Sequence, residues 1–217
     1  MVRSQIGRVI VVFHGCTAAC HCTANDKKKE RSHIMAKVYA MIANGTEEVE
    51  CLAVVDILRR SGIETVLVSI NDTCDTLSSH NVKIQADAKI ADVDFSDGDA
   101  IFLPGGLPGS EYLSACEPLI EAIKQALADG RRVAAICAAP GVVLGRHGFL
   151  EGKTATCFPG FEKEFKGSVY TMQGVVTDGN ITTARGLGFA IDLGLELVKL
   201  LKNEEIAEDT KKKIQYS

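Results

Sequence analysis

The stretch from Arg131 to Gly145 constrains the fold of this chain more than any other. It reads Arg-Arg-Val-Ala-Ala-Ile-Cys-Ala-Ala-Pro-Gly-Val-Val-Leu-Gly, and its apolar run at 133–136 is typical of a fully buried strand. A cysteine and small residues follow at once, and then an apolar segment with helical spacing. A strand that becomes a helix within two or three residues must bend sharply. The pattern predicts a nucleophile elbow that exposes the Cys137 thiol at the carboxyl edge of a sheet.

The chemistry expected of Cys137 follows from that position. The N–H groups at the start of the following helix, together with the helix dipole, are expected to favour the thiolate over the thiol. The alternative is an inert packing cysteine, which is the commoner role of a buried thiol. The elbow sequence by itself leaves both readings open.

Short apolar runs alternate with amphipathic stretches along the rest of the chain. The pair Gly179-Asn180 is a hairpin signal. Strand-helix alternation predicts a doubly wound, mostly parallel sheet sandwiched by helices, with ligands bound beyond the carboxyl ends of the strands. The predicted strands are 37–43, 64–70, 82–86, 100–103, 133–136, 153–157, 175–178 and 181–184, and the predicted helices are 47–60, 119–127 and 189–201.

Length and charge limit the classes of function. A chain of 217 residues is ample for one domain with a single large core. The net charge is −4, but residues 1–34 carry six basic and two acidic residues, so the remaining 18 basic and 26 acidic residues leave 35–217 at −8. This balance argues against nucleic acid as the main partner. No apolar run approaches the roughly 20 residues that span a bilayer.

The first 34 residues do not read as part of the fold. The run Lys27–Arg31 can be encoded by purines alone and ends three codons before Met35, which resembles a bacterial ribosome-binding site ahead of a start codon. We therefore expect residues 1–34 to be a disordered leader or mis-annotated extension, and residues 35–217 to form a single domain. The cysteines and histidines at 14–22 match no standard zinc spacing, so no metal site is predicted. The five later cysteines, without a signal peptide, indicate free thiols in a reducing cytoplasm.

Two further features fall just after predicted strands, at the same sheet edge as Cys137. Glu50 lies on the packing side of helix 47–60; it is either an N-terminal residue that still reaches water or a half-buried acid whose pKa is raised. Gly105 and Gly106 allow backbone N–H groups to approach a ligand closely, or they form an ordinary turn. Glu50, the Gly105-Gly106 pair and Cys137 are thus all expected at one edge of the sheet. This convergence favours a functional role for each of them. The G-x-G-x-x-G and G-x-x-x-x-G-K-[ST] patterns are missing, so no nucleotide site is predicted.

Four motifs carry a resemblance to a known family. They are Ala-Ile-Cys137-Ala-Ala-Pro, Leu-Pro-Gly105-Gly106, Glu47-Glu48-Val49-Glu50 and Thr183-Ala184-Arg185-Gly186. Together they resemble the DJ-1/ThiJ/PfpI family over residues 35–212, and its DJ-1/YajL-like branch most, because Ala138 and not histidine follows the cysteine. The resemblance implies a flavodoxin-like α/β sandwich, similar to class I glutamine amidotransferases, and usually a homodimer.

The resemblance also assigns roles to residues. Cys137 matches the reactive cysteine, and Glu50 matches its protonated partner carboxyl. Some relatives place a histidine before the proline at 159, where this chain has Phe158, so a nearby histidine is missing. The oxyanion and substrate-binding positions are Gly105, Gly106 and Ala138, and the further pocket residues are Phe158, Arg185 and His80.

A cysteine–glutamate pair without histidine makes a poor protease, because the leaving amine needs a general acid. Addition of a thiolate to an aldehyde expels nothing. The resemblance thus implies glyoxalase III or deglycase chemistry on methylglyoxal, glyoxal or glycated adducts, in defence against carbonyl and oxidative stress, with no metal, glutathione or nucleotide cofactor. The alternative is a cysteine-based redox sensor or stress chaperone without significant turnover. In that reading Cys157 is a candidate second redox thiol.

Overall fold

The central strand β1 (Lys37–Ile42) shows how the sequence forms a sheet with two buried faces. Its even-numbered residues pack into one hydrophobic cluster and its odd-numbered residues Tyr39 and Met41 into a second. This two-residue alternation is that of a strand covered on both sides. The computed structural model describes residues 36–217, so the predictions for residues 1–34 lie outside the described residues.

Seven strands form the main sheet in the order β10-β11-β7-β6-β1-β2-β5. All neighbours are parallel except β10 and β11, which form the predicted antiparallel hairpin. Two small sheets, β3 with β4 and β8 with β9, lie outside it. The strands after β1 are β2 (Glu64–Ser69), β3 (Asp75–Leu77), β4 (Lys83–Gln85), β5 (Ala88–Lys89), β6 (Ala100–Leu103), β7 (Arg132–Ile136), β8 (Thr154–Ala155), β9 (Val169–Tyr170), β10 (Val175–Asp178) and β11 (Ile181–Ala184).

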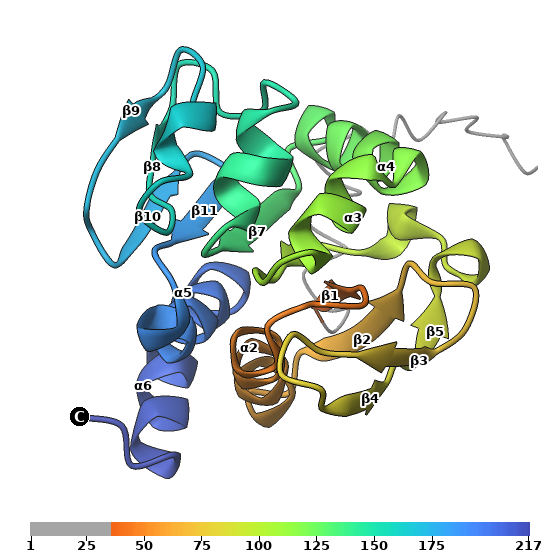
Figure 1. Cartoon of the computed structure of the whole chain (residues 1–217). Helices are drawn as coiled ribbons and strands as arrows, with labels where there is room; N and C mark the ends of the chain where they lie inside the picture. The colour runs from red at the N-terminus through yellow and green to blue at the C-terminus, as the bar shows by residue number, and fades with distance from the viewer. Residues whose placement is uncertain (1–35) are drawn as a thin grey trace, which may run out of the picture. The chain divides into compact units, whose positions relative to one another are not determined.

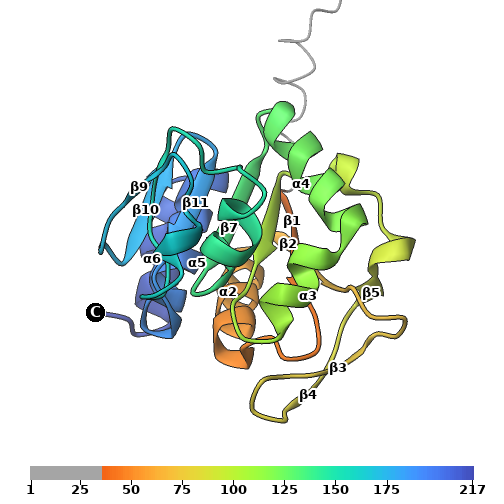
Figure 2. The same ribbon diagram turned by 45° about the horizontal axis from the view of Figure 1, so that its top comes forward.

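Helices cover both faces of the main sheet, which confirms the predicted doubly wound α/β sandwich (Figures 1 and 2). One face packs against α2 and α5, and the other against α3 and α4. Within residues 36–217, none of the helices combines the length and apolar character needed to cross a membrane. The helices are α2 (Glu48–Arg60), α3 (Gly109–Ala115), α4 (Glu117–Ala128), α5 (Ala190–Leu201) and α6 (Glu204–Lys213).

The segment after Cys137 differs from the expected α-helix. Residues Pro140–Gly145 form a π-helical turn, in which the Arg146 N–H donates to the carbonyl of Gly141, five residues back, at 3.1 Å. A side chain at Gly141 would collide with the backbone of Phe161. The wider turn therefore brings a neighbouring loop against the elbow, and π-turns of this kind are frequent at functional sites.

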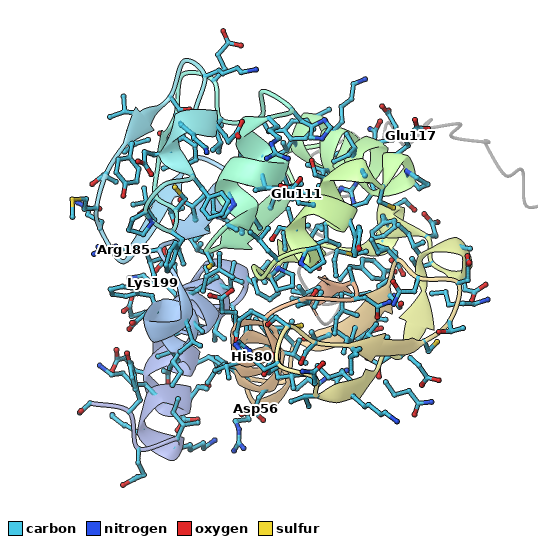
Figure 3. The ribbon with its side chains drawn as sticks, in the orientation of Figure 1. Asp56, His80, Glu111, Glu117, Arg185 and Lys199 are labelled. Atoms are coloured by element: carbon cyan, nitrogen blue, oxygen red, sulfur yellow. The ribbon has the colours of Figure 1, made fainter. Side chains whose placement is uncertain are left out.

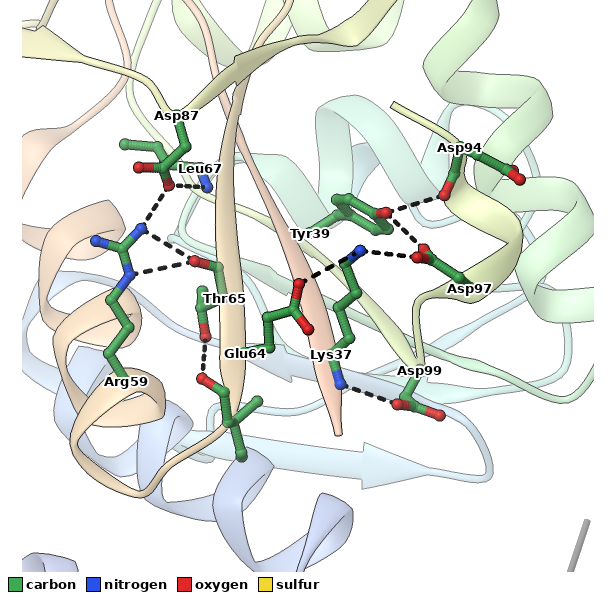
Figure 4. A network of polar contacts seen from close by, with 11 residues as sticks. Lys37, Tyr39, Arg59, Glu64, Thr65, Leu67, Asp87, Asp94, Asp97 and Asp99 are labelled. Carbon is green, nitrogen blue, oxygen red and sulfur yellow. Dashed lines mark hydrogen bonds and ion pairs between the residues drawn. The ribbon is translucent and has the colours of Figure 1, made fainter. Parts of the chain in front are cut away.

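A polar network fixes the amino end of β1 (Figure 4). Cys137 follows the carboxyl end of β7, which runs in the same direction as β1, so the network lies at the opposite edge of the sheet from Cys137. The Lys37 ammonium lies 2.8 Å from Asp97, and the Tyr39 hydroxyl donates to the same carboxylate at 2.5 Å. The hydrogen bond with Asp97 is the main cause that raises the pKa of Lys37. These charges have partners within the fold, so they indicate a structural role rather than a second site.

Candidate functional site

Cys137 occupies the corner between β7 and the π-helical turn. Its φ is +64°, in the left-handed region that residues other than glycine seldom adopt. Backbone hydrogen bonds fix it from both sides: its N–H donates to Ala184 O at 2.9 Å, and the Phe158 N–H donates to its carbonyl at 2.8 Å. Strained backbone persists only where surrounding structure holds it, and such residues cluster at active sites.

Glu50 lies in the first turn of α2 and is only 1% exposed. Its Oε2 accepts from the Gly105 N–H at 3.1 Å, and its carboxyl also forms hydrogen bonds with the Cys137 thiol and the Leu187 N–H. Burial raises the pKa of Glu50 to about 7, and the charge of Glu47 adds to this effect, while the hydrogen bonds oppose it. The residue is thus a buried acid that titrates near neutral pH.

Glu47 caps the start of α2, because its carboxylate accepts from the Glu50 N–H at 2.6 Å. The hydroxyl of the preceding residue, Thr46, accepts from the Ala43 N–H at 3.0 Å. Through this cap, the negative charge of Glu47 lies next to Glu50, the residue that faces Cys137.

The two glycines after β6 allow the close approach of these groups. A Cβ at Gly105 would lie 2.5 Å from the Cβ of Cys137 and would also collide with the Glu50 carboxylate. Gly106 has φ +90°, and a side chain there would strike the backbone of residues 45–47. The N–H groups of Gly106 and Ala138 both donate to the Cys137 sulfur. Two backbone donors therefore converge on the sulfur of Cys137.

The thiol of Cys137 is less acidic than the elbow alone predicted. Burial raises its pKa, followed by the negative charge of Glu50 and the hydrogen bond with that carboxylate, while the Ala138 and Gly106 N–H groups lower it less. The N–H groups after the elbow therefore act in the predicted direction and favour the thiolate, but burial and a charged Glu50 outweigh them. The repulsion disappears when Glu50 takes up a proton. The pair consequently titrates as a unit.

Phe158 and Arg185 lie in the connections next to the elbow. The Phe158 side chain is about half exposed, and its ring lies beside Gly186. Arg185 follows β11, is half-buried, and donates its N–H to Gly174 O at 2.9 Å. Figure 3 labels Arg185 above α5.

His80 lies in the β3–β4 loop, where it is exposed beside α2 (Figure 3). Its Nδ1 is 3.1 Å from Glu48 Oε1 and 3.8 Å from Glu47 Oε1. Within residues 36–217, these three side chains place ligand atoms within 4.8 Å of one another, close enough to hold a metal ion. Contacts lead from His80 through Glu47 and Glu50 to Cys137. The role of His80 at the pocket mouth stays a prediction, as does the lack of a metal.

Two other cysteines, Cys51 and Cys157, differ from Cys137 in solvent access. Burial raises the pKa of all three thiols, but Cys51 and Cys157 are fully buried, whereas Cys137 is only half-buried. A thiol without access to solvent reacts slowly. This disfavours Cys157 as a second redox thiol.

One contact at the site was missed by the sequence reasoning. The Leu187 N–H reaches Glu50 from the connection between β11 and α5. The only signal was the sequence Arg185-Gly186-Leu187-Gly188, whose glycines allow close approach of the backbone. Nothing in that motif points to Glu50 as the partner.

Comparison with known proteins gives consistent matches. The model of the DJ-1/PfpI family matches residues 36–200. "Protein DJ-1 homolog B" of Arabidopsis thaliana is 39% identical over 172 residues, which cover 79% of this chain and 39% of that protein. "Glutathione-independent glyoxalase DJR-1.2" of Caenorhabditis elegans is 30% identical over 160 residues, 73% of this chain and 84% of that protein.

Solved structures show the same fold. "Toxoplasma gondii DJ-1, oxidized" superposes with a TM-score of 0.81 at 35% identity, over 84% of this chain and 99% of that one. The structure of Drosophila melanogaster DJ-1beta also gives 0.81, at 31% identity, over 85% and 100%. The chain spans about two fifths of the length of the two Arabidopsis relatives. The family model covers most of the chain and relatives match it over most of its length, so this chain belongs to the DJ-1/PfpI family.

Proposed function

We propose that this protein converts small α-oxoaldehydes, such as methylglyoxal and glyoxal, into 2-hydroxyacids without a cofactor. The observation that carries the proposal is the placement of the Cys137 sulfur against the Glu50 carboxyl and the N–H groups of Gly106 and Ala138. A nucleophile, a proton carrier and two oxyanion donors are the groups that this reaction needs. The name of the Caenorhabditis elegans relative, a glutathione-independent glyoxalase, supports it.

In the first step, the Cys137 sulfur adds to the aldehyde carbon. A carbon–sulfur bond forms, the C=O π electrons move to oxygen, and no group leaves. The resulting oxyanion accepts hydrogen bonds from the Gly106 and Ala138 N–H groups until it is protonated. The product is a hemithioacetal.

In the second step, Glu50 moves a proton between adjacent carbons. Its carboxylate removes the hydrogen from the former aldehyde carbon, giving an enediol, and returns a proton to the neighbouring carbon. The two carbons exchange oxidation states, so no external oxidant is used. The resulting thioester of Cys137 is hydrolysed by water to a 2-hydroxyacid and the free thiol. A pKa of about 7 suits a group that must both take and give a proton near neutral pH.

Measurement of hydroxyacid formation from methylglyoxal by purified protein tests the proposal. Cys137→Ala should abolish turnover, and Glu50→Gln should lower kcat by about a hundredfold or more. Cys116→Ala is the matched control, because Cys116 is also half-buried but lies at the start of α4; it should leave the rate unchanged. Undiminished methylglyoxal consumption by Cys137→Ala would end the proposal.

A redox sensor or stress chaperone is the second candidate. The same N–H donors that face the Cys137 sulfur could hold the oxygens of a sulfinate, and the Toxoplasma relative was solved in a form described as oxidized. Intact mass after mild peroxide distinguishes the two functions. Addition of two oxygens at Cys137 in a protein without aldehyde turnover would favour the sensor.

We also propose that the protein acts on glycated substrates, forms a homodimer and is cytoplasmic. Deglycation of early adducts uses the same addition to a carbonyl, so glycated substrates belong to the proposed range. A homodimer and a cytoplasmic location follow from family membership and from the free cysteines. Light scattering on the purified protein tests the dimer.

A further inference from the structure

Three large apolar side chains belong to segments that contact the reacting groups, and they are open to solvent. Leu107, Phe158 and Leu187 are each 49% exposed. For each of them, the backbone of the residue itself or of its neighbour in the sequence contacts the site. Leu107 follows Gly106, one of the donors to the sulfur.

The other two side chains are connected to the site more directly. The Phe158 N–H donates to the carbonyl of Cys137 at 2.8 Å, and the Leu187 N–H donates to the Glu50 carboxyl. The Phe158 ring lies beside Gly186, since a Cβ there would meet it at 3.4 Å. The Phe158 ring therefore lies next to the segment that carries Leu187.

Ligand sites are lined mainly by apolar side chains with a few placed polar groups. Here the polar groups are those that hold the reacting atoms. The substituent of an α-oxoaldehyde projects away from the sulfur, toward the rim. Glyoxal has no substituent, and the methyl group of methylglyoxal is too small to cover three large side chains.

The charges near the site disfavour an anionic substituent. Glu47 and Glu48 lie on the α2 side, with Glu47 close enough to raise the pKa of Glu50. Arg185 is the nearby cation, but its charge acts on Tyr170, in β9. A neutral apolar substituent fits these surroundings best.

Resting on the proposed function, we propose that Leu107, Phe158 and Leu187 form an apolar rim that selects α-oxoaldehydes with an aryl or extended alkyl substituent over methylglyoxal and glyoxal. The rim does no chemistry. It contributes binding that grows with the apolar area of the substituent, so it affects the choice among substrates.

The test compares kcat/KM of the full chain across glyoxal, methylglyoxal, 2-oxohexanal and phenylglyoxal. Methylglyoxal and 2-oxohexanal carry the same reacting groups, so their ratio reports contacts of the alkyl chain. We expect 2-oxohexanal to exceed methylglyoxal by about tenfold or more, the range of discrimination that apolar pockets achieve. Leu187→Ser, Phe158→Ser and Leu107→Ser should each lower this ratio by about threefold or more, for the same reason.

Val169→Ser is the matched control, because Val169 is 63% exposed on β9 and is not part of the rim; the ratio should stay as in the wild type. Because the rim residues are half exposed, their serine variants should fold, and thermal unfolding verifies this. Competition with mandelate against lactate gives a second readout: mandelate should bind more tightly to the wild type, and Leu187→Ser should remove the difference.

The outcomes separate this inference from the proposed function. Equal kcat/KM across the series, or preference for an aldehyde that bears a carboxylate, would overturn the apolar rim and leave the glyoxalase proposal intact. No turnover with any aldehyde would overturn the proposed function. Leu187→Ser could also leave the ratio of kcat/KM for 2-oxohexanal to methylglyoxal unchanged and abolish a dimer. That result would show that a second copy covers these side chains, and it would also overturn the inference.

Discussion

At the scale of single residues, Cys137 and Glu50 act on each other's protons. The carboxylate of Glu50 raises the pKa of the thiol, and burial raises the pKa of Glu50 itself. Only the form with one proton shared between them contains both a nucleophile and a proton carrier. The form with two protons has no nucleophile.

This coupling predicts an acid limb in the pH profile. Burial raises the pKa of Glu50 to about 7, so the pair passes from two protons to one as the pH rises through that value. We expect kcat/KM for methylglyoxal to rise with pH up to about 7 and then to level off. In Glu50→Gln the residual activity should lose this limb. An unchanged limb in that variant would show that another group controls it.

The same pKa predicts how Glu50 affects stability. Because its pKa rises from 4.5 to about 7 in the folded state, the folded protein binds this proton more tightly than the unfolded chain does. Its contribution to stability is therefore present below pH 4.5 and is lost as the pH rises toward 7. Glutamine cannot lose a proton. Between pH 5 and pH 8, the unfolding free energy of Glu50→Gln should gain about 2 kcal/mol relative to wild type, as measured by urea titration.

Glu48→Gln provides the control with the opposite sign. Burial alone would raise the pKa of Glu48, but hydrogen bonds from its own backbone, Ser78 and His80 lower it below the ordinary value. A lowered pKa stabilises the fold above the unfolded value, so this variant should lose stability relative to wild type as the pH rises. Equal pH dependence of the two variants would contradict both assignments.

At the scale of elements, the strength of the local pattern decided what could be predicted. The buried strands β6 and β7 and the β10–β11 hairpin follow from apolar runs and a turn signal. The short helix α3 was not predicted, because Leu113 is its one buried large side chain. A single apolar position cannot show the repeat of about 3.6 residues that indicates a helix. The π-turn depends on contacts of Gly141 with a distant loop, which the local sequence does not encode.

Packing between α2 and α5 offers a test at this scale. A Cβ at Gly194 of α5 would lie 2.9 Å from the Cβ of Ile57 on α2. Gly194→Ala gains about 1 kcal/mol of helix propensity, but overpacking a core costs about 1–3 kcal/mol. We therefore expect a net loss of up to about 2 kcal/mol in the unfolding free energy. In an Ile57→Ala background the same change should become stabilising, and a destabilising effect there would show that Ile57 is not the obstacle.

At the scale of the whole molecule, parallel strands explain why much of the site was predictable. The carboxyl ends of parallel strands share one edge, so Glu50, Gly106 and Cys137 were expected together, and the structure brings them together. The contribution of Leu187 was not predictable, because the order of β11 beside β7 in the sheet depends on long-range pairing. Of the three residues of the proposed apolar rim, Phe158 was expected in the pocket from the family resemblance, whereas Leu107 and Leu187 were not.

The two cores share strands β1, β2, β6, β7 and β11 of the main sheet, so we expect them to unfold as one unit. Cys51 reports on the face covered by α2, and Cys157 is buried just after β8, whose Ala155 belongs to the core on the other face. In pulsed alkylation with increasing urea, read by peptide mass, both thiols should become reactive in the same transition as the loss of helical circular dichroism. The half-buried Cys74 and Cys116 serve as controls and should react before it. Labelling of Cys51 or Cys157 at lower urea would show that one face opens while the other stays folded. Repeating the measurement at a second protein concentration distinguishes such opening from dissociation of a dimer.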